Sequence, residues 1–194
     1  GLLQWVMKGI KHSTTLKLQL IVTGSHLYKK YGYTKDIIEN DGFKIDKKIY
    51  INLGTDTSLG ITRSMSKGLL GFSKALNNLK PDLLMVLGDR YEIFTAVVAS
   101  MNANIPIAHL HGGESTEGMA DEAIRHSITK MSHLHFVAAE EYKNRIIQMG
   151  EHPSKVYKVG GLGLDSIKKL KFLSKAKIEK KINFKFLKKN LLIT

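Results

Sequence analysis

Residues 83–114 read LLMVLGDR-YEIFTAVVASMNAN-IPIAHLHGGE, with two short apolar runs on either side of a helix-compatible segment. The runs at residues 83–87 and 105–108 have the length and composition of buried strands. A strand, a helix and a second strand of these lengths predict a parallel βαβ unit. Ligands of open parallel sheets bind beyond the carboxyl ends of the strands. We therefore expect Asp89 and the cluster from His109 to Glu114 at one edge.

A third group of ionisable side chains opens the next expected helix, and it reads DEAIRH at residues 121–126. Three sets of chemistry-bearing residues are thus expected to converge on one crevice. Each set also has a structural alternative. Asp89 could cap the helix that follows it by accepting free N–H groups. The carboxylates of Asp121 and Glu122 could instead interact favourably with the dipole at the start of their own helix and pair with Arg125 one turn later.

His109 and His111 lie two residues apart and would share one face of a strand. Together with Glu114 they form H-x-H-G-G-E. Two histidines and a carboxylate suit a divalent cation, and a polar loop with one satisfied histidine is a further alternative. The pair Gly112 and Gly113 indicates positive φ or a backbone that approaches a ligand closely. We favour a catalytic or substrate-binding loop that holds no metal.

The rest of the chain alternates helix and strand patterns, which predicts a doubly wound α/β domain with a parallel sheet. Gly68 and Gly71 inside one helix indicate close packing. The glycine-rich turn at residues 160–163 lacks the full G-x-G-x-x-G spacing, so we interpret it as a strand-to-helix turn. Helices are expected over 2–12, 34–39 with Thr34 as cap, 58–79 starting at Ser58 or Thr62, 91–104, 121–131, 140–149 and 164–173; strands are expected over 18–23, 48–51, 82–87, 105–110, 135–138 and 156–159.

Composition excludes several classes of protein. The 194 residues contain no cysteine, hence no disulfide framework or thiolate. No apolar run approaches the roughly 20 residues that span a bilayer, so we expect a cytoplasmic protein with no membrane partner. The net charge is +13, but ten lysines and one glutamate lie between Lys168 and Lys189. With few arginines and no interleaved aromatics, this segment predicts a linker or exposed helix and no nucleic-acid partner.

Both ends indicate a fragment. The chain begins at Gly1 with no preceding strand, and residues 191–193 have the pattern of an opening strand. We expect residues 1–167 to form a domain truncated at its start, with its first strand missing. Residues 168–194 are expected to hold a Lys-rich linker and the first strand of a missing C-terminal domain.

The motifs together resemble the hydrolysing UDP-N-acetylglucosamine 2-epimerases of sialic-acid and related nonulosonic-acid pathways. They read GDRYE at residues 88–92, HLHGGE at 109–114, DEAIRHSITK at 121–130 and VGGLGLD at 159–165. The resemblance implies the N-terminal Rossmann-like half of a GT-B fold, with the active site between two domains. It implies a UDP-sugar substrate, no cofactor or metal, and a homo-oligomer at full length.

The implied reaction eliminates UDP from C1 with loss of the C2 proton, and water then adds to the glycal to give N-acetylmannosamine. The resemblance assigns acid–base catalysis to Asp89, Glu114, Asp121 and Glu122. Some relatives carry glutamate where this chain has His111. The implied substrate-binding residues are Arg90, His109, His111, Gly112, Gly113, Arg125 and His126.

Alternatives remain open from the sequence. A related enzyme would act on a UDP-diacetamido-trideoxy sugar in legionaminic-type synthesis, and a non-hydrolysing epimerase would equilibrate UDP-sugars. From another class, the chain would be a non-catalytic sugar-binding domain or a gene remnant. The 194 residues alone are expected to be inactive.

Overall fold

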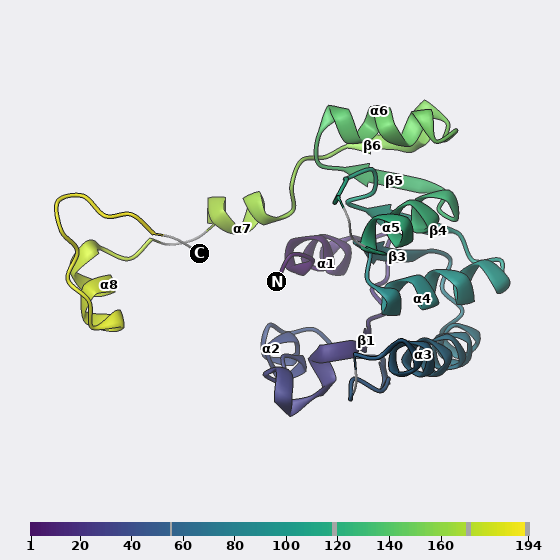
Figure 1. The fold of residues 1–194 in the computed structure, drawn as a ribbon, viewed down its shortest axis with the longest axis horizontal. Helices are drawn as coiled ribbons and strands as arrows, with labels where there is room; N and C mark the ends of the chain where they lie inside the picture. Colours follow the sequence, from purple (N-terminus) through teal and green to yellow (C-terminus); the bar gives the residue numbers. More distant parts are fainter. Residues whose placement is uncertain (55, 118–119, 170–171, 193–194) are drawn as a thin grey trace. The chain divides into compact units, whose positions relative to one another are not determined.

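The structure is a computed structural model that describes residues 1–54, 56–117, 120–169 and 172–192 (Figure 1). Helices and strands alternate along the chain, as the sequence predicts. In order, they are α1 (Gln4–His12), β1 (Ile21–Thr23), the 3₁₀ turns η1 (Gly24–Leu27) and η2 (Lys29–Tyr31), α2 (Lys35–Asn40), β2 (Lys47–Ile49), α3 (Ser58–Leu79), β3 (Leu84–Leu87), α4 (Tyr91–Asn102), β4 (Ile107–Leu110), α5 (Ala120–Lys130), β5 (Leu134–Val137), α6 (Glu140–Gln148), η3 (Pro153–Lys155), β6 (Val156–Lys158), α7 (Gly163–Lys169) and α8 (Lys175–Ile182).

Two predicted helix starts differ in their capping. The α3 helix is capped by Thr57, whose hydroxyl accepts from the Gly60 amide at 3.1 Å, and not by Ser58 or Thr62. The Thr34 side chain does not cap α2, because its hydroxyl bonds the His26 ring at 2.6 Å instead. Both helices still begin where the sequence places them.

The C-terminal predictions are less accurate. The α7 helix ends at Lys169, and the predicted helix at 164–173 is wrong for Phe172 and Leu173, which are not helical; residues 170–171 lie outside the described part. Leu191 and Leu192 lie in neither helix nor strand, and the third residue of that predicted strand lies outside the described residues.

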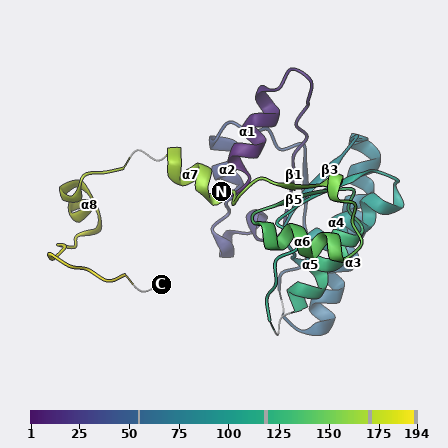
Figure 2. The same ribbon diagram turned by 90° about the horizontal axis from the view of Figure 1, so that it is seen from above.

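The described strands form two parallel sheets, one with the order β1-β2 and one with the order β3-β4-β5-β6. Leu87 is level with Leu110, and Leu110 with Phe136, so the carboxyl ends of the three strands meet at one edge. Figure 2 shows α3, α4, α5 and α6 on one side of the strands and α1 on the other. The predicted α/β architecture with parallel pairing is confirmed.

Two buried clusters join the sheets to their covering helices. One packs α3 and α4 against β2, and the other joins β3, β4, α4 and α5. A Cβ on Gly71 would lie 2.6 Å from Ile49, and one on Gly68 would lie 2.8 Å from the Thr95 hydroxyl. The close packing predicted at these glycines is therefore present, against β2 at Gly71 and against α4 at Gly68.

The chain divides into two compact units, Gly1–Leu162 and Gly163–Thr194. In the second unit, Asn183 directly follows α8 and has a left-handed conformation. The rings of Phe184 and Phe186 pack edge to face, with their centres 5.4 Å apart. The Lys-rich segment thus contains an exposed helix, one of its two predicted forms. All predicted site residues belong to the first unit.

Candidate active site

Arg125 joins the turns that follow β3 and β4. It lies on α5 with 6% of its surface exposed. Its guanidinium donates to the Asp89 carboxylate, to the main-chain oxygen of Glu114 at 3.0 Å and to the Thr116 hydroxyl at 3.2 Å. A guanidinium is a permanent cation with several donors in one plane, so this buried side chain binds three acceptors in the two turns at once. The structure therefore brings Asp89 and Glu114 together.

These contacts decide between the alternatives for two sequence motifs. Asp89 does not cap α4, because Arg90 occupies the cap position and Asp89 pairs with Arg125. Arg125 is bound across the sheet edge to Asp89, not within its own helix to Asp121 or Glu122. Both side chains thus serve the edge of the sheet, and the predicted alternatives of a cap at Asp89 and of Arg125 pairing within its own helix are wrong.

His111 and Glu114 pair with each other in the turn after β4. The Nδ1 atom of His111 lies 2.7 Å from Oε1 of Glu114. Its other ring nitrogen is shielded from solvent and has no hydrogen-bond partner among the described residues. The backbone of His111 is left-handed, with φ of 61°, which costs a non-glycine residue about 1–2 kcal/mol. Strain and an unpaired buried nitrogen at one residue are typical of a site that a ligand completes.

The two glycines let this turn lie directly against its neighbours. A Cβ on Gly113 would stand 2.4 Å from the main-chain oxygen of Tyr142, and one on Gly112 would stand 2.9 Å from the His109 ring. Gly113 also has φ of +75°. The predicted need for positive φ is confirmed at Gly113, and the close approaches are to the protein's own α6 and to His109 of β4.

Arg145 of α6 also holds this turn, and sequence reasoning missed it. Its guanidinium donates to the main-chain oxygen of Gly113. A signal was present in the composition, since the chain uses 26 lysines but only four arginines. Arg90, Arg125 and Arg145 all make bonds at this edge. Scarce arginines in a Lys-rich chain indicate positions that need the planar, multidentate donor.

His109 is completely buried and bonds only protein groups. Its Nε2 lies 2.9 Å from the carbonyl oxygen of Gly88, and its Nδ1 lies 3.2 Å from the Thr129 hydroxyl. Burial lowers the pKa of His109 to about 4, so the ring stays neutral and donates from Nε2 to Gly88. His109 therefore fixes the turn that carries Asp89, with no exposed ring atom to contact substrate.

Glu122 fastens the loop that leads into α5. Its Oε2 accepts from the Thr116 amide at 2.9 Å and the Ser115 hydroxyl at 3.1 Å, and these bonds hold its pKa below the ordinary value. Its other oxygen lies 3.5 Å from His126, as the i,i+4 spacing predicts. The Nδ1 atom of His126 is buried and unpaired among the described residues. Both carboxylate oxygens of Glu122 thus contact groups of the protein, whereas Nδ1 of His126 has no hydrogen-bond partner among the described residues.

Glu92, in the first turn of α4, is a second residue that the sequence reasoning left without a role. Only 7% of it is exposed, and Oε1 accepts from Arg90 at 2.8 Å. Its Oε2 is buried with no partner among the described residues. The hydrogen bond to Glu92 is the largest cause of a raised pKa of Arg90, and the charge of half-buried Asp121 raises it to a smaller extent. The Arg90–Glu92 pair lies at the start of α4, and the charge of Asp121 at the start of α5 acts on Arg90.

The described residues offer neither a metal-binding cluster nor a membrane span. Among them, no group of three or more His, Asp or Glu side chains is arranged to hold a metal ion. No helix in the described ranges is both long and apolar enough to cross a membrane.

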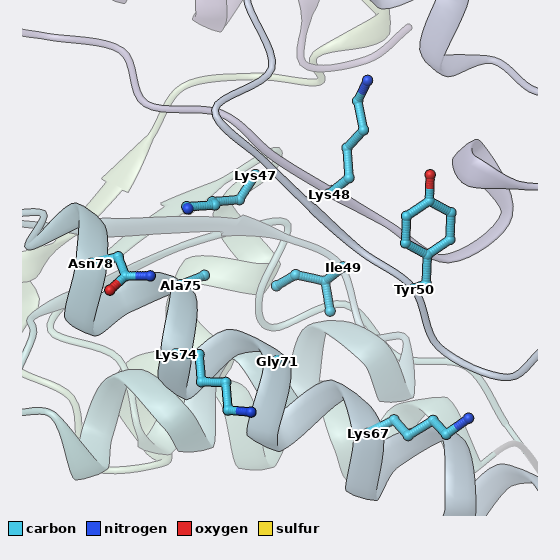
Figure 3. A pocket seen from close by; sticks show the side chains of 9 residues that line it. All are labelled: Lys47, Lys48, Ile49, Tyr50, Lys67, Gly71, Lys74, Ala75 and Asn78. Carbon is cyan, nitrogen blue, oxygen red and sulfur yellow. The ribbon is translucent and has the colours of Figure 1, made fainter.

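A cavity of about 290 Å³ lies elsewhere, between β2 and α3, and none of the predicted site residues line it (Figure 3). Its lining includes Lys47, Lys48, Lys67 and Lys74. Within the described part of the chain β2 pairs with β1 alone, so its other edge is open to a further strand, and β2 itself carries Lys47 and Lys48. Charged side chains at such an edge oppose unwanted strand pairing.

The profile of the family described as UDP-N-acetylglucosamine 2-epimerase matches residues 8–194. The chain belongs to this family. It is 45% identical over 185 residues to the GDP/UDP-N,N'-diacetylbacillosamine 2-epimerase (hydrolyzing) of Campylobacter jejuni, which covers 95% of the chain and 48% of the relative. It is 44% identical over 181 residues to the polysialic acid biosynthesis protein P7 of Escherichia coli, covering 93% and 46%.

The chain spans about half the length of these family members. The UDP-N-acetylglucosamine 2-epimerase of Neisseria meningitidis serogroup B is 31% identical over 165 residues, covering 85% of the chain and 43% of that relative. A crystal structure of a UDP-GlcNAc 2-epimerase from Neisseria meningitidis bound to UDP-GlcNAc superposes with a TM-score of 0.77 at 21% identity, covering 93% of this chain and 50% of that one. The chain thus has the N-terminal, Rossmann-like half of the GT-B fold of this family.

Proposed function

We propose that the chain supplies the sugar-facing half of a hydrolysing UDP-sugar 2-epimerase. The observation that carries this proposal is the buried Arg125, which ties Asp89 to the turn of His111 and Glu114 at the carboxyl edge of the sheet. That edge is where open α/β sheets bind their ligands. Hydrolysing 2-epimerases are among the relatives of highest identity.

The proposed reaction has two stages. In the first, a base takes the proton from C2 of the sugar while the bond between C1 and the UDP oxygen breaks, leaving a glycal. In the second, water adds its oxygen to C1 and C2 receives a proton, which gives the free 2-epimer. Both proton transfers need groups placed within hydrogen-bond reach. We assign them to Asp89, Glu114 and Asp121, with His111 and His126 contacting the sugar.

UDP-N-acetylglucosamine is the proposed substrate, with N-acetylmannosamine as product. A UDP-diacetamido-trideoxy sugar is the second candidate. The reason to test this second sugar is the 45% and 40% identity to two diacetylbacillosamine 2-epimerases, beside 31% to the meningococcal UDP-N-acetylglucosamine 2-epimerase. The two sugars differ at C4 and C6, so a direct competition between them distinguishes the candidates.

The test is UDP release by the protein in its natural full length, measured with each sugar in D₂O. We expect UDP release together with one deuterium at C2 of the free sugar. Asp89→Asn should slow release by about 100-fold or more, since positioned acid–base groups contribute about 10²–10⁴-fold. Asp82→Asn is the matched control, because Asp82 is exposed and precedes the same strand. Absence of UDP release with both sugars, or equal rates for the two variants, would refute the proposal.

A further inference from the structure

The main chain between His111 and Glu114 is held from α6. The guanidinium of Arg145 donates to the carbonyl oxygen of Gly113, one residue before Glu114. The same guanidinium lies 6.0 Å from the centre of the Tyr142 ring. Since the Tyr142 backbone also limits the space at Gly113, the turn has contact with α6 through both a side chain and a main chain.

Three successive points of the turn are fixed by bonds to different elements. The His111 amide donates to the Phe136 carbonyl of β5 at 2.9 Å. Arg145 holds the oxygen of Gly113, and Arg125 holds the oxygen of Glu114. Gly113 is left-handed, and the peptide group that joins it to Glu114 carries the Gly113 oxygen. Of these three bonds, only the Arg145 bond is made to that peptide group. We expect loss of that bond to loosen this peptide and to displace the Glu114 side chain, within the limits set by the Arg125 and His111 contacts of Glu114.

We propose that Arg145 is a positioning residue for the His111–Glu114 pair, acting through the main chain of Gly113. Arg145 does not contact the sugar in this proposal, which rests on the proposed function for its catalytic consequence. Displacement of a reacting group by about 1 Å can cost on the order of 100-fold in rate. A guanidinium suits this task, because its fork bonds the carbonyl while its plane lies near an aromatic ring.

The first test compares Arg145→Ala, Arg145→Lys and Asn144→Ala in the full-length protein. Asn144 is exposed on the same helix and serves as the matched control. We expect Arg145→Ala to lower kcat by about 100-fold with KM changed less than about 3-fold, because sugar binding is kept and its positioning is lost. Arg145→Lys should recover part of the loss, and added millimolar guanidinium should raise the rate of Arg145→Ala but not of the wild type. Unchanged kcat in Arg145→Ala would overturn the proposal.

The second test asks whether Arg145 acts through Glu114. If it does, the double variant Arg145→Ala/Glu114→Gln is no slower than Glu114→Gln alone. Rate losses that multiply would show that Arg145 acts elsewhere and would overturn the proposal.

A third measurement does not depend on activity. Amide hydrogen exchange in residues 111–116 should become at least about 10-fold faster in Arg145→Ala, while β3 and β5 keep wild-type exchange. If the wild type releases no UDP but this local change is present, the proposed function fails and the positioning role stands. If exchange in the turn is unchanged, the positioning role fails.

Discussion

Replacing Arg125 by methionine should lower the free energy of unfolding by about 3 kcal/mol. Removing one partner of a buried ion pair typically costs about 3–5 kcal/mol, because the remaining charge stays buried without compensation. The Asp89 side chain is 20% exposed, so water reaches part of its carboxylate and the lower end of that range applies. The main-chain oxygen of Glu114 and the Thr116 hydroxyl lose their donor as well.

The measurement is urea denaturation followed by far-UV circular dichroism. Arg63→Met is the matched control: Arg63 is exposed on α3, so its replacement should stay within about 0.5 kcal/mol. The double variant Asp89→Asn/Arg125→Met has no unpaired carboxylate, so its loss should be smaller than the sum of the two single losses by at least about 1.5 kcal/mol. If the single losses add to within about 0.5 kcal/mol, the two residues are not coupled and the reasoning fails.

Three further predictions concern packing and pH. Gly113→Ala should destabilise the protein by about 2 kcal/mol or more and reduce UDP release, because its Cβ meets the Tyr142 main chain and its φ is +75°; a wild-type urea midpoint would contradict this. His109 has a pKa lowered to about 4, so an unfolded histidine takes up a proton below about pH 6.5 when the folded one does not. Stability should therefore fall from pH 6.5 to 4, by up to about 1.4 kcal/mol per unit, and His109→Gln should flatten that slope. Gly71→Ala places a Cβ 2.6 Å from a β2 methyl and should destabilise by about 1–3 kcal/mol, whereas Gly9→Ala on open α1 should stabilise by about 0.5–1 kcal/mol in thermal melts.

Much of the fold was predictable because the strands are short apolar runs bounded by glycine, proline and charged residues. The run before Gly88 and the run after Pro106 became β3 and β4 in parallel register. Capping was less predictable, since Thr57, Ser58 and Thr62 all carry hydroxyls, and any of the three could accept from a free amide at the start of a helix. The end of α7 was misjudged because its periodic apolar residues continue beyond the last helical turn at Lys169.

The positions of the site residues were predictable where the sheet topology determines them. The hydrogen-bond partners of the side chains were not predictable, because they depend on tertiary contacts. The parallel register alone places Asp89 and Glu114 at one edge. It does not reveal that Arg125 reaches Asp89 across the edge instead of an acid on its own helix, because that choice depends on burial. The Arg145 contact depends on two glycines that bring the turn onto α6, which no local spacing encodes.

Hydrogen-bond capacity separates the site residues into two groups. One group, His109, Glu122 and Arg125, forms its hydrogen bonds with other groups of the protein. These residues therefore hold the turns at the edge in position. His111, His126 and Glu92 each keep one buried polar atom unpaired among the described residues.

A buried polar atom without a partner costs about 1–3 kcal/mol. A polar ligand that gives hydrogen-bond partners to these three atoms would recover part of that cost on binding. A sugar with hydroxyl and amide groups supplies both donors and acceptors. We therefore predict that Glu92 joins the group of substrate-facing residues when a ligand displaces the groups that cover its Oε2. Glu92→Gln, which removes the charge and keeps the shape, should raise KM for the UDP-sugar more than it lowers kcat, and an unchanged KM would remove Glu92 from that group.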